Sequence, residues 1–329
     1  MCERVWRRPE LIIAASLVAA CSSDSLTGTS GRHWVVQSSG TTQDLFGVWG
    51  SSASDVFAVG QGGTILHYDG SSWSVQVSGT TAELSGVWGS SPTDVFAVGR
   101  PATILHFDGS RWSAQSGAVP QSFLRGVWGT SAADVFVVGS IISGTATVLR
   151  YNGTAWRAET LATTASLASV WGTSSANVIA VGMSGSVVRY NGSSWTGEYG
   201  GGFLWNLGGV WGSAANDVFA VGYVQDNLGG WTSRVLHYDG ARWATVASGA
   251  IANLSLTGVW GVSSSDVFVV GGVLVGDRVQ GTIHHYSGGR WSRWSREPTD
   301  VVGPLAGVSG AGSDVFAVGA SGLIIHGSR

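Results

Sequence analysis

Acidic side chains recur at one repeated position of this sequence. Six copies carry Asp and one carries Asn, at Asp55, Asp94, Asp134, Asn177, Asp217, Asp266 and Asp314. Carboxylates at fixed spacing suggest metal ligands or general acid–base groups. Each one lies between a short polar segment and an apolar run, where an Asx-type turn is typical and Asn works almost as well as Asp. We therefore expect these residues to build turns.

Histidines form a second column, between 12 and 20 residues further on. They are His67, His106, His237, His285 and His326, and Arg150 and Arg189 take the same place in two copies. A metal needs ligands gathered around one point, whereas one His per repeat spreads them apart, and Arg is a poor ligand. We predict a structural role here, with no metal and no cofactor.

Short apolar runs carry both columns and are separated by turn residues. In one copy the runs are 47–50, 56–59, 64–68 and 73–77, rich in Val, Ile, Tyr and Trp, which predicts four strands. Asp69-Gly70 predicts a tight hairpin turn with positive φ at both central residues. Each copy is therefore a four-stranded antiparallel meander.

The second run, Val-Phe-Ala-Val, is apolar on both faces and must be covered on both. Stacked copies of the meander provide that cover. Seven copies begin near residues 47, 86, 126, 169, 209, 258 and 307, between 39 and 49 residues apart. A repeat of four short strands in about forty residues is typical of a β-propeller blade.

The two ends of the chain complete one repeat between them. The seventh copy ends at 324–329, after its third run, and residues 33–40 match the fourth run at 73–79. A ring closed by the N-terminal strand explains this division, because closure covers a bare sheet edge. We predict an all-β fold, a seven-bladed β-propeller over 33–329, and a monomer.

The repeat resembles two known patterns. An apolar run ending in Gly60, then Tyr68-Asp69, then Trp73, is similar to the kelch repeat and to the Asp-box repeats of bacterial neuraminidases. Only Gly271-Gly272 supplies the kelch double glycine, and Asp69 lies one residue closer to Trp73 than in an Asp-box. The resemblance implies a propeller, and its neuraminidase side implies a sialidase-like glycoside hydrolase or lyase as the alternative function.

Composition narrows the function classes. The formal charge is −3, and all 17 basic residues are Arg, interspersed with acidic ones. No basic stripe marks a nucleic-acid interface. Because the sequence has no Lys, it offers neither a Schiff-base lysine nor a phosphate-loop lysine.

The N-terminus has the pattern of a targeting segment. Arg4, Arg7 and Arg8 precede the apolar run 11–20, which is too short to span a membrane. The run ends in Leu-Val-Ala-Ala-Cys, which resembles the lipobox of bacterial lipoproteins. That resemblance implies a signal peptide over 1–20, lipidation of Cys21, a flexible tether over 21–32 and a place in the bacterial cell envelope. An ordinary signal peptide cleaved near Ala20 is the alternative.

Thirteen of the 17 Trp residues occupy two repeated positions, on the first and fourth strands. An aromatic ring at such a position stacks sugars or packs between blades. Packing is the interpretation we favour, and Ser309 interrupts the first-strand set.

Residues that break the repeat point to a binding face. Between strands two and three, inserts occur at 141–145, 223–233 and 273–280, on the face that also carries the strand four–one connections. Aromatic and charged residues gather there and form our candidate ligand site: Tyr199, Phe203, Trp205, Tyr223, Asp226, Trp231, Arg234, Arg278 and Trp294.

The remaining question is catalysis or binding. Glycoside hydrolysis needs two placed carboxylates or a Tyr–Glu pair. After residue 20 the only Glu residues are Glu83, Glu159, Glu198 and Glu297, and Glu198-Tyr199 is the one adjacent Glu–Tyr pair. We therefore predict a non-catalytic, membrane-anchored binding or scaffold module for glycan or protein partners.

Overall fold

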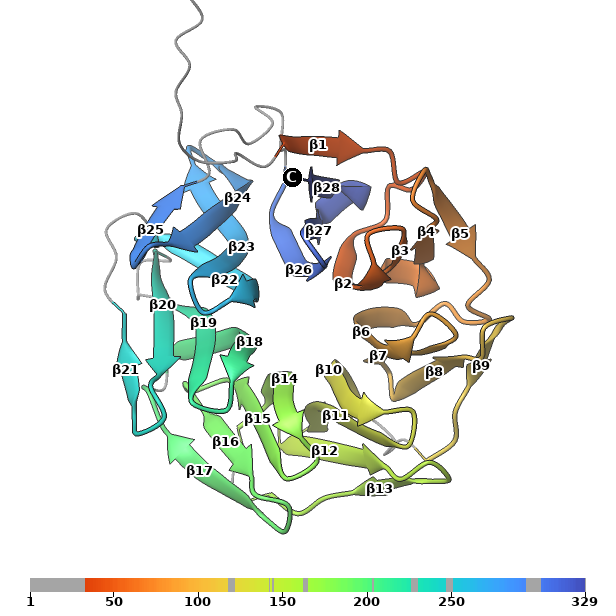
Figure 1. Cartoon of the computed structure of the whole chain (residues 1–329), viewed down its shortest axis with the longest axis horizontal. Coiled ribbons are helices and arrows are strands. Elements are labelled where there is room, and N and C mark those ends of the chain that lie inside the picture. Colours follow the sequence, from red (N-terminus) through yellow and green to blue (C-terminus); the bar gives the residue numbers. More distant parts are fainter. Residues whose placement is uncertain are drawn as a thin grey trace, which may run out of the picture. The chain divides into compact units, whose positions relative to one another are not determined.

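In the computed structural model, the chain forms a ring of seven four-stranded sheets around a central axis (Figure 1). The structure describes residues 33–117, 122–141, 143, 145–161, 165–202, 204–225, 230–246, 251–293 and 303–328. In every sheet, neighbouring strands are antiparallel. The predicted all-β, seven-bladed β-propeller is confirmed.

The first four blades follow one another along the chain. Blade one comprises β2 (Leu45–Ser52), β3 (Asp55–Gly60), β4 (Ile65–Tyr68) and β5 (Trp73–Gln76). Blade two comprises β6 (Glu83–Ser91), β7 (Asp94–Arg100), β8 (Thr103–Phe107) and β9 (Trp112–Ala114). Blade three comprises β10 (Ser122–Ser131), β11 (Asp134–Ile141), β12 (Ala146–Tyr151) and β13 (Trp156–Ala158). Blade four comprises β14 (Leu167–Ser174), β15 (Asn177–Gly182), β16 (Val187–Tyr190) and β17 (Trp195–Tyr199).

The last three blades include the shared one. Blade five comprises β18 (Trp205–Ala214), β19 (Asp217–Gln225), β20 (Trp231–Tyr238) and β21 (Trp243–Thr245). Blade six comprises β22 (Leu254–Ser263), β23 (Asp266–Val275), β24 (Arg278–Ser287) and β25 (Arg290–Arg293). Blade seven comprises β26 (Leu305–Ala311), β27 (Asp314–Gly319), β28 (Ile324–Ser328) and β1 (His33–Gln37). Short 3-10 turns, η1 (Gln61–Gly63) and η3 (Ala320–Gly322), join the second and third strands of blades one and seven.

The second strand of each blade contributes to two cores at once. In β3, Val56 and Ala58 pack toward blade seven, and Phe57 and Val59 pack toward blade two. All four side chains are at most 1% exposed. Successive strand residues face opposite sides of a sheet, so a strand that is apolar throughout supplies both interfaces. Each of the seven clusters of buried side chains lies between two neighbouring blades.

The N-terminal strand closes the ring. Strand β1 pairs with β28, with His33 opposite Ser328 and Gln37 opposite Ile324 (Figure 1). Trp34 is 6% exposed and packs edge-on against Phe268 of blade six, at 6.1 Å between ring centroids. The predicted closure is therefore confirmed.

Gln37 also joins β1 to the next blade. Its Oε1 accepts a hydrogen bond from the Trp73 indole N–H at 2.7 Å. Its Nε2 lies 3.2 Å from His326 Nδ1 on β28. One side chain thus connects the last strand of blade seven with the last strand of blade one.

The Asp-Gly turns differ from the tight hairpin predicted. Pairing ends at Tyr68 and Trp73, which leaves a four-residue loop in which Gly70, with φ +95°, is the residue at positive φ. Asp69 Oδ1 accepts hydrogen bonds from the backbone N–H groups of Ser71 and Ser72. A hydrogen bond from the Ser71 hydroxyl, together with these two backbone bonds, lowers the pKa of Asp69 to about 2. The loop needs only a side-chain oxygen that accepts these bonds, so Asn occupies the same position in blades three and four.

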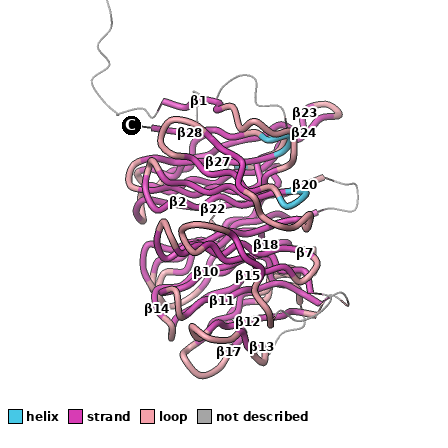
Figure 2. Tube along the Cα trace, turned by 90° about the vertical axis from the view of Figure 1, so that its right-hand side faces the viewer, coloured by secondary structure: helices cyan, strands magenta, loops and turns pink. Residues whose placement is uncertain are grey.

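The inserts in blades five and six extend strands, although loops were expected. Strand β19 continues to Gln225 and β20 begins at Trp231, while β23 and β24 leave only Gly276 and Asp277 unpaired between them. The paired inserted residues include four Val (Val224, Val273, Val275 and Val279) together with Tyr223, Trp231 and Thr232, residue types that favour strand pairing. The β20 and β23–β24 ends and the 3-10 turns lie on one side of the disc (Figure 2).

First-strand tryptophans pack against glycines of the following blade, as the sequence predicts. A Cβ added to Gly89 would lie 2.6 Å from the Trp49 ring, and one added to Gly310 would lie 2.5 Å from Trp260. The same contact recurs from blade to blade up to the seventh, where Ser309 replaces Trp. Consequently, Gly50 in blade one has no tryptophan among its nearest neighbours.

No helix within the described ranges has the length and apolar character that crossing a bilayer requires.

The Trp–Gly contact predicts different costs for one substitution at two equivalent positions. Gly89→Ala should destabilise the protein by about 1–3 kcal/mol, because the added methyl overpacks against Trp49. Gly50→Ala should cost clearly less, because no Trp faces it. Urea denaturation of the two variants measures the difference in the free energy of unfolding. Equal destabilisation would contradict the proposed packing.

Candidate functional site

The two polar columns of the sequence are partners. His67 Nε2 lies 2.6 Å from Asp55 Oδ1, and the equivalent pair in blade two, His106 and Asp94, is at 2.7 Å. Blades five, six and seven repeat the pair. In blade three, Arg150 Nε donates to Asp134 at 2.8 Å. The carboxylates therefore bind across strands two and three, which differs from the Asx turn expected.

In some blades a serine hydroxyl also binds the Asp of the pair. The order of the three groups nevertheless does not activate the serine as a nucleophile. Ser51 Oγ donates to Asp55 Oδ2, while the other oxygen of Asp55 binds His67. A Ser–His–Asp triad needs the imidazole between hydroxyl and carboxylate, so that it accepts the serine proton. Here the carboxylate lies in the middle. Phe57 stacks on His67 at 4.4 Å between ring centroids, which fixes the ring in the blade.

The described residues assemble no metal cluster, and Glu198 of the adjacent Glu–Tyr pair has other partners. No group of three or more His, Cys, Asp or Glu side chains in these residues is arranged to hold a metal. Glu198 forms an ion pair with Arg189 and accepts a hydrogen bond from the Trp243 indole at 3.0 Å. Its carboxylate is therefore engaged between blades four and five.

Blade five separates the predicted aromatic residues onto its two faces. Arg234 lies over the Trp205 ring at 5.0 Å, and Tyr199 lies 6.1 Å from the same ring. Tyr223 and Trp231 form a second pair at 6.3 Å. Because Tyr223 pairs with Ser233 and the next residue, Arg234, pairs with Gly222, the two groups face opposite sides of the sheet.

The other predicted site residues are placed separately or not described. Arg278 is exposed at the tip of the β23–β24 hairpin, where Leu274 and Val275 are 56% and 50% exposed. The remaining predicted positions lie outside the described residues: Cys21, Phe203, Asp226 and Trp294.

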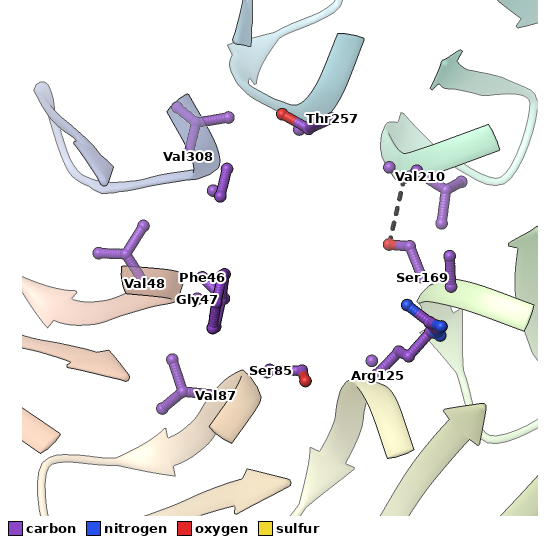
Figure 3. Close-up of a pocket in the computed structure, with 18 of the residues that line it drawn as sticks. Phe46, Gly47, Val48, Ser85, Val87, Arg125, Ser169, Val210, Thr257 and Val308 are labelled. Carbon is purple, nitrogen blue, oxygen red and sulfur yellow. Dashed lines mark hydrogen bonds between the residues drawn. The ribbon is translucent and has the colours of Figure 1, made fainter. Parts of the chain in front are cut away.

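A β-bulge in every first strand builds the wall of a central channel. The register shifts by one residue between Leu45 and Gly47, between Leu84 and Gly86, and at the equivalent place in the other five blades. A bulge leaves one residue unpaired and re-aims its side chain. The seven bulged residues line the channel (Figure 3): Phe46, Ser85, Arg125, Ala168, Gly208, Thr257 and Ala306.

Glycine after the bulge lets the innermost strands approach closely. A Cβ at Gly86 would lie 2.6 Å from the carbonyl oxygen of Arg125, and one at Gly307 would lie 2.7 Å from that of Phe46. Blade four has Ser169 instead, and its Oγ accepts a hydrogen bond from the Val210 N–H at 3.3 Å (Figure 3). The channel cavity that these strands line has a volume of about 180 Å³.

The channel widens into a mouth on the face of the strand two–three and four–one connections. This cavity, of about 430 Å³, is lined by Arg100, Met183 and Tyr223 as well as by bulged residues. Glu83 is also part of the lining, and its Oε2 lies 2.7 Å from Arg100 Nη2. Of the predicted site residues that the structure describes, Tyr223 lines the mouth.

Sequence reasoning missed the bulged position although the repeats contain its signal. In the pattern Leu-x-Gly-Val-Trp-Gly, the flanking residues are almost constant and x differs between most blades. Residues fixed by packing recur, whereas this one is free to vary. Strict two-residue alternation hides the bulge, because it assigns every strand residue to one face or the other.

Comparison with known proteins shows the fold. The sequence matches no family profile and no curated relative. Among solved structures, YCF48 bound to D1 peptide superposes with a TM-score of 0.68 at 13% identity, covering 92% of this chain and 96% of that one. A catalytically inactive virginiamycin B lyase from Staphylococcus aureus with quinupristin gives 0.68 at 10% identity, with coverages of 91% and 99%.

The WD40 β-propeller domain of Doa1 gives a TM-score of 0.67 at 13% identity, covering 91% of this chain and 97% of that one. These similarities extend over nearly the whole propeller. They support the seven-bladed architecture, while the kelch-like type stays a prediction.

Proposed function

We propose that the protein is a non-catalytic binding propeller that is tethered to a bacterial membrane and recognises a protein partner through the face around the channel mouth. The main observation is that every blade places a bulged residue at one opening, and that this residue differs between most blades on a scaffold that is otherwise nearly repetitive. Repeat proteins bind through the face on which their repeats differ.

Exposed apolar side chains on the mouth face favour a protein partner over a glycan. Met183 is 53% exposed, Leu204 is 47% exposed and Leu274 is 56% exposed, all on connections or hairpin ends of this face. Exposed apolar groups beside a few charges are typical of protein interfaces. Trp205, a candidate platform for sugar stacking, is covered by Arg234. The YCF48 structure, in which a propeller binds a D1 peptide, supports the same choice.

The tether is the second part of the proposal. The lipobox-like sequence before Cys21 supports acylation of that residue, and a doubly acylated cysteine binds a membrane stably where one chain does not. Residues 21–32, rich in Ser, Thr and Gly, would then link the lipid to the propeller.

The anchor predicts a change of cell fraction. Cys21→Ser should move the protein from the membrane fraction to the soluble fraction, because no acyl chain can be attached at residue 21. Fractionation followed by immunoblotting measures the distribution, with Cys2→Ser as the matched control that stays with the membrane. Membrane retention of the Cys21 variant would show that the anchor lies elsewhere.

The binding face predicts selective crosslinking. A photoreactive residue at Leu274 should crosslink to an envelope protein identified by mass spectrometry, and Met183→Asp should abolish that crosslink by placing a charge in the interface. The matched control is a photoreactive residue at Val262, which is 43% exposed. It lies at the end of β22 that is away from the channel mouth.

Equal crosslinking from both positions would contradict the assignment of the face. A glycan array probed in parallel distinguishes the remaining alternative. Glycan binding that Met183→Asp abolishes, without any protein crosslink, would replace the protein partner by a carbohydrate.

A further inference from the structure

The channel mouth contains an arginine, Arg125, that pairs with no carboxylate of the described residues. Arg125 is the charged residue among those lining the channel, and it also lines the mouth. No hydrogen bond or ion pair joins its guanidinium to the described residues, and the side chain is exposed to the cavity. Figure 3 shows it at the rim of the opening, beside blade four.

The carboxylate that shares the mouth is already paired. Glu83 lies on the same cavity wall, but its Oε2 is 2.7 Å from Arg100 Nη2, and the two residues are opposite each other in the β6–β7 register. Arg125 thus remains the positive charge that an incoming anion can reach. A guanidinium binds a carboxylate through two parallel N–H···O bonds, which makes it selective for planar anions.

A second donor lies on the neighbouring bulge. Ser85 occupies in blade two the position of Arg125 in blade three, and both side chains lie at the opening (Figure 3). The Ser85 hydroxyl makes no hydrogen bond with the described residues, so its proton is available to a ligand oxygen. The corresponding hydroxyl of Thr257 is engaged, because it donates to the carbonyl of Leu305 at 2.9 Å.

The size and lining of the mouth indicate what carries the anion. About 430 Å³ accepts a side chain or a chain end but not a folded domain. Phe46, Met183 and Tyr223 add apolar and aromatic surface to the same cavity. A free inorganic anion would leave that surface uncovered, whereas an acidic group on an apolar chain covers it.

We propose that the mouth binds a carboxylate of a polypeptide, from an acidic side chain or a chain end next to apolar residues, and that Arg125 pairs with it. The inference rests on the proposed binding function and adds the chemical class of the ligand. Glu83 weakens this binding for two reasons. It neutralises Arg100, and its negative charge near the site repels the ligand carboxylate.

The test uses the full chain and short fluorescein-labelled peptides in matched pairs. Each pair has one Glu between Leu and Phe residues, or a free terminal carboxylate, against its Gln or terminal-amide counterpart. Fluorescence anisotropy should show binding of the acidic member. Arg125→Gln should weaken it about 10- to 100-fold, the effect of losing one charge-assisted hydrogen bond, while Arg125→Lys keeps part of the affinity.

A variant of opposite sign separates recognition from structure. Glu83→Gln should strengthen binding about two- to fivefold, since it removes a partly exposed negative charge and releases Arg100. Arg111→Gln is the control, because Arg111 is 81% exposed and lies in the strand three–four turn on the other face. It should change nothing.

Three results would overturn the inference. Equal binding of the acidic and amide peptides, or unchanged binding by Arg125→Gln, would show that the mouth does not recognise a carboxylate. Inorganic phosphate or an acidic oligosaccharide could also compete at least as strongly as the peptide. That result would show that the ligand is not specifically a polypeptide. In either case the Leu274 crosslink to a protein would persist if the binding face is right, so failure of the ligand class is distinguishable from failure of the proposed function.

Discussion

Each sheet of this protein is apolar on both faces, and the rest of the structure depends on covering both. The alternation of Val56 and Phe57 toward different neighbours means that no blade has a solvent side. A linear stack would leave two bare ends, whereas a ring leaves none. Closure is therefore a requirement of the core, and the N-terminal strand meets it by completing blade seven and by holding blade one through Gln37.

The same constraint leaves few places in which function can vary. Residues between blades are fixed by their contacts: the first-strand Trp by the Gly of the next blade, and the strand-three His by its Asp and Phe. The bulged residue and the strand two–three connections are released from those contacts. Phe46 and Arg125 can therefore differ in size and charge without disturbing the ring, and both face the channel.

Sequence reasoning reached the parts of the structure that are encoded locally. Blade number, closure by residues 33–37 and Trp packing follow from short apolar runs and their spacing. The Asp–His pairing was not predicted because the Asp and His positions were considered separately. The Arg that replaces His in blades three and four was not recognised as a second partner for the same position. The turn at Asp69 was misassigned because an Asp side chain can cap a four-residue loop as well as start a tight one. The channel was missed because a bulge breaks the two-residue period on which strand prediction relies.

Obligatory closure can be tested most directly by removing β1 and supplying it again. A chain that lacks residues 33–40 should unfold at a lower temperature than the intact protein and expose the β28 edge. A synthetic peptide of residues 33–40 should restore the melting temperature, while the same peptide with Trp34 replaced by Ala should not, because Trp34 fills the interface with blade six. If the shortened chain were as stable and as monomeric as the intact one, the ring would not depend on its N-terminal strand, and the account would be wrong.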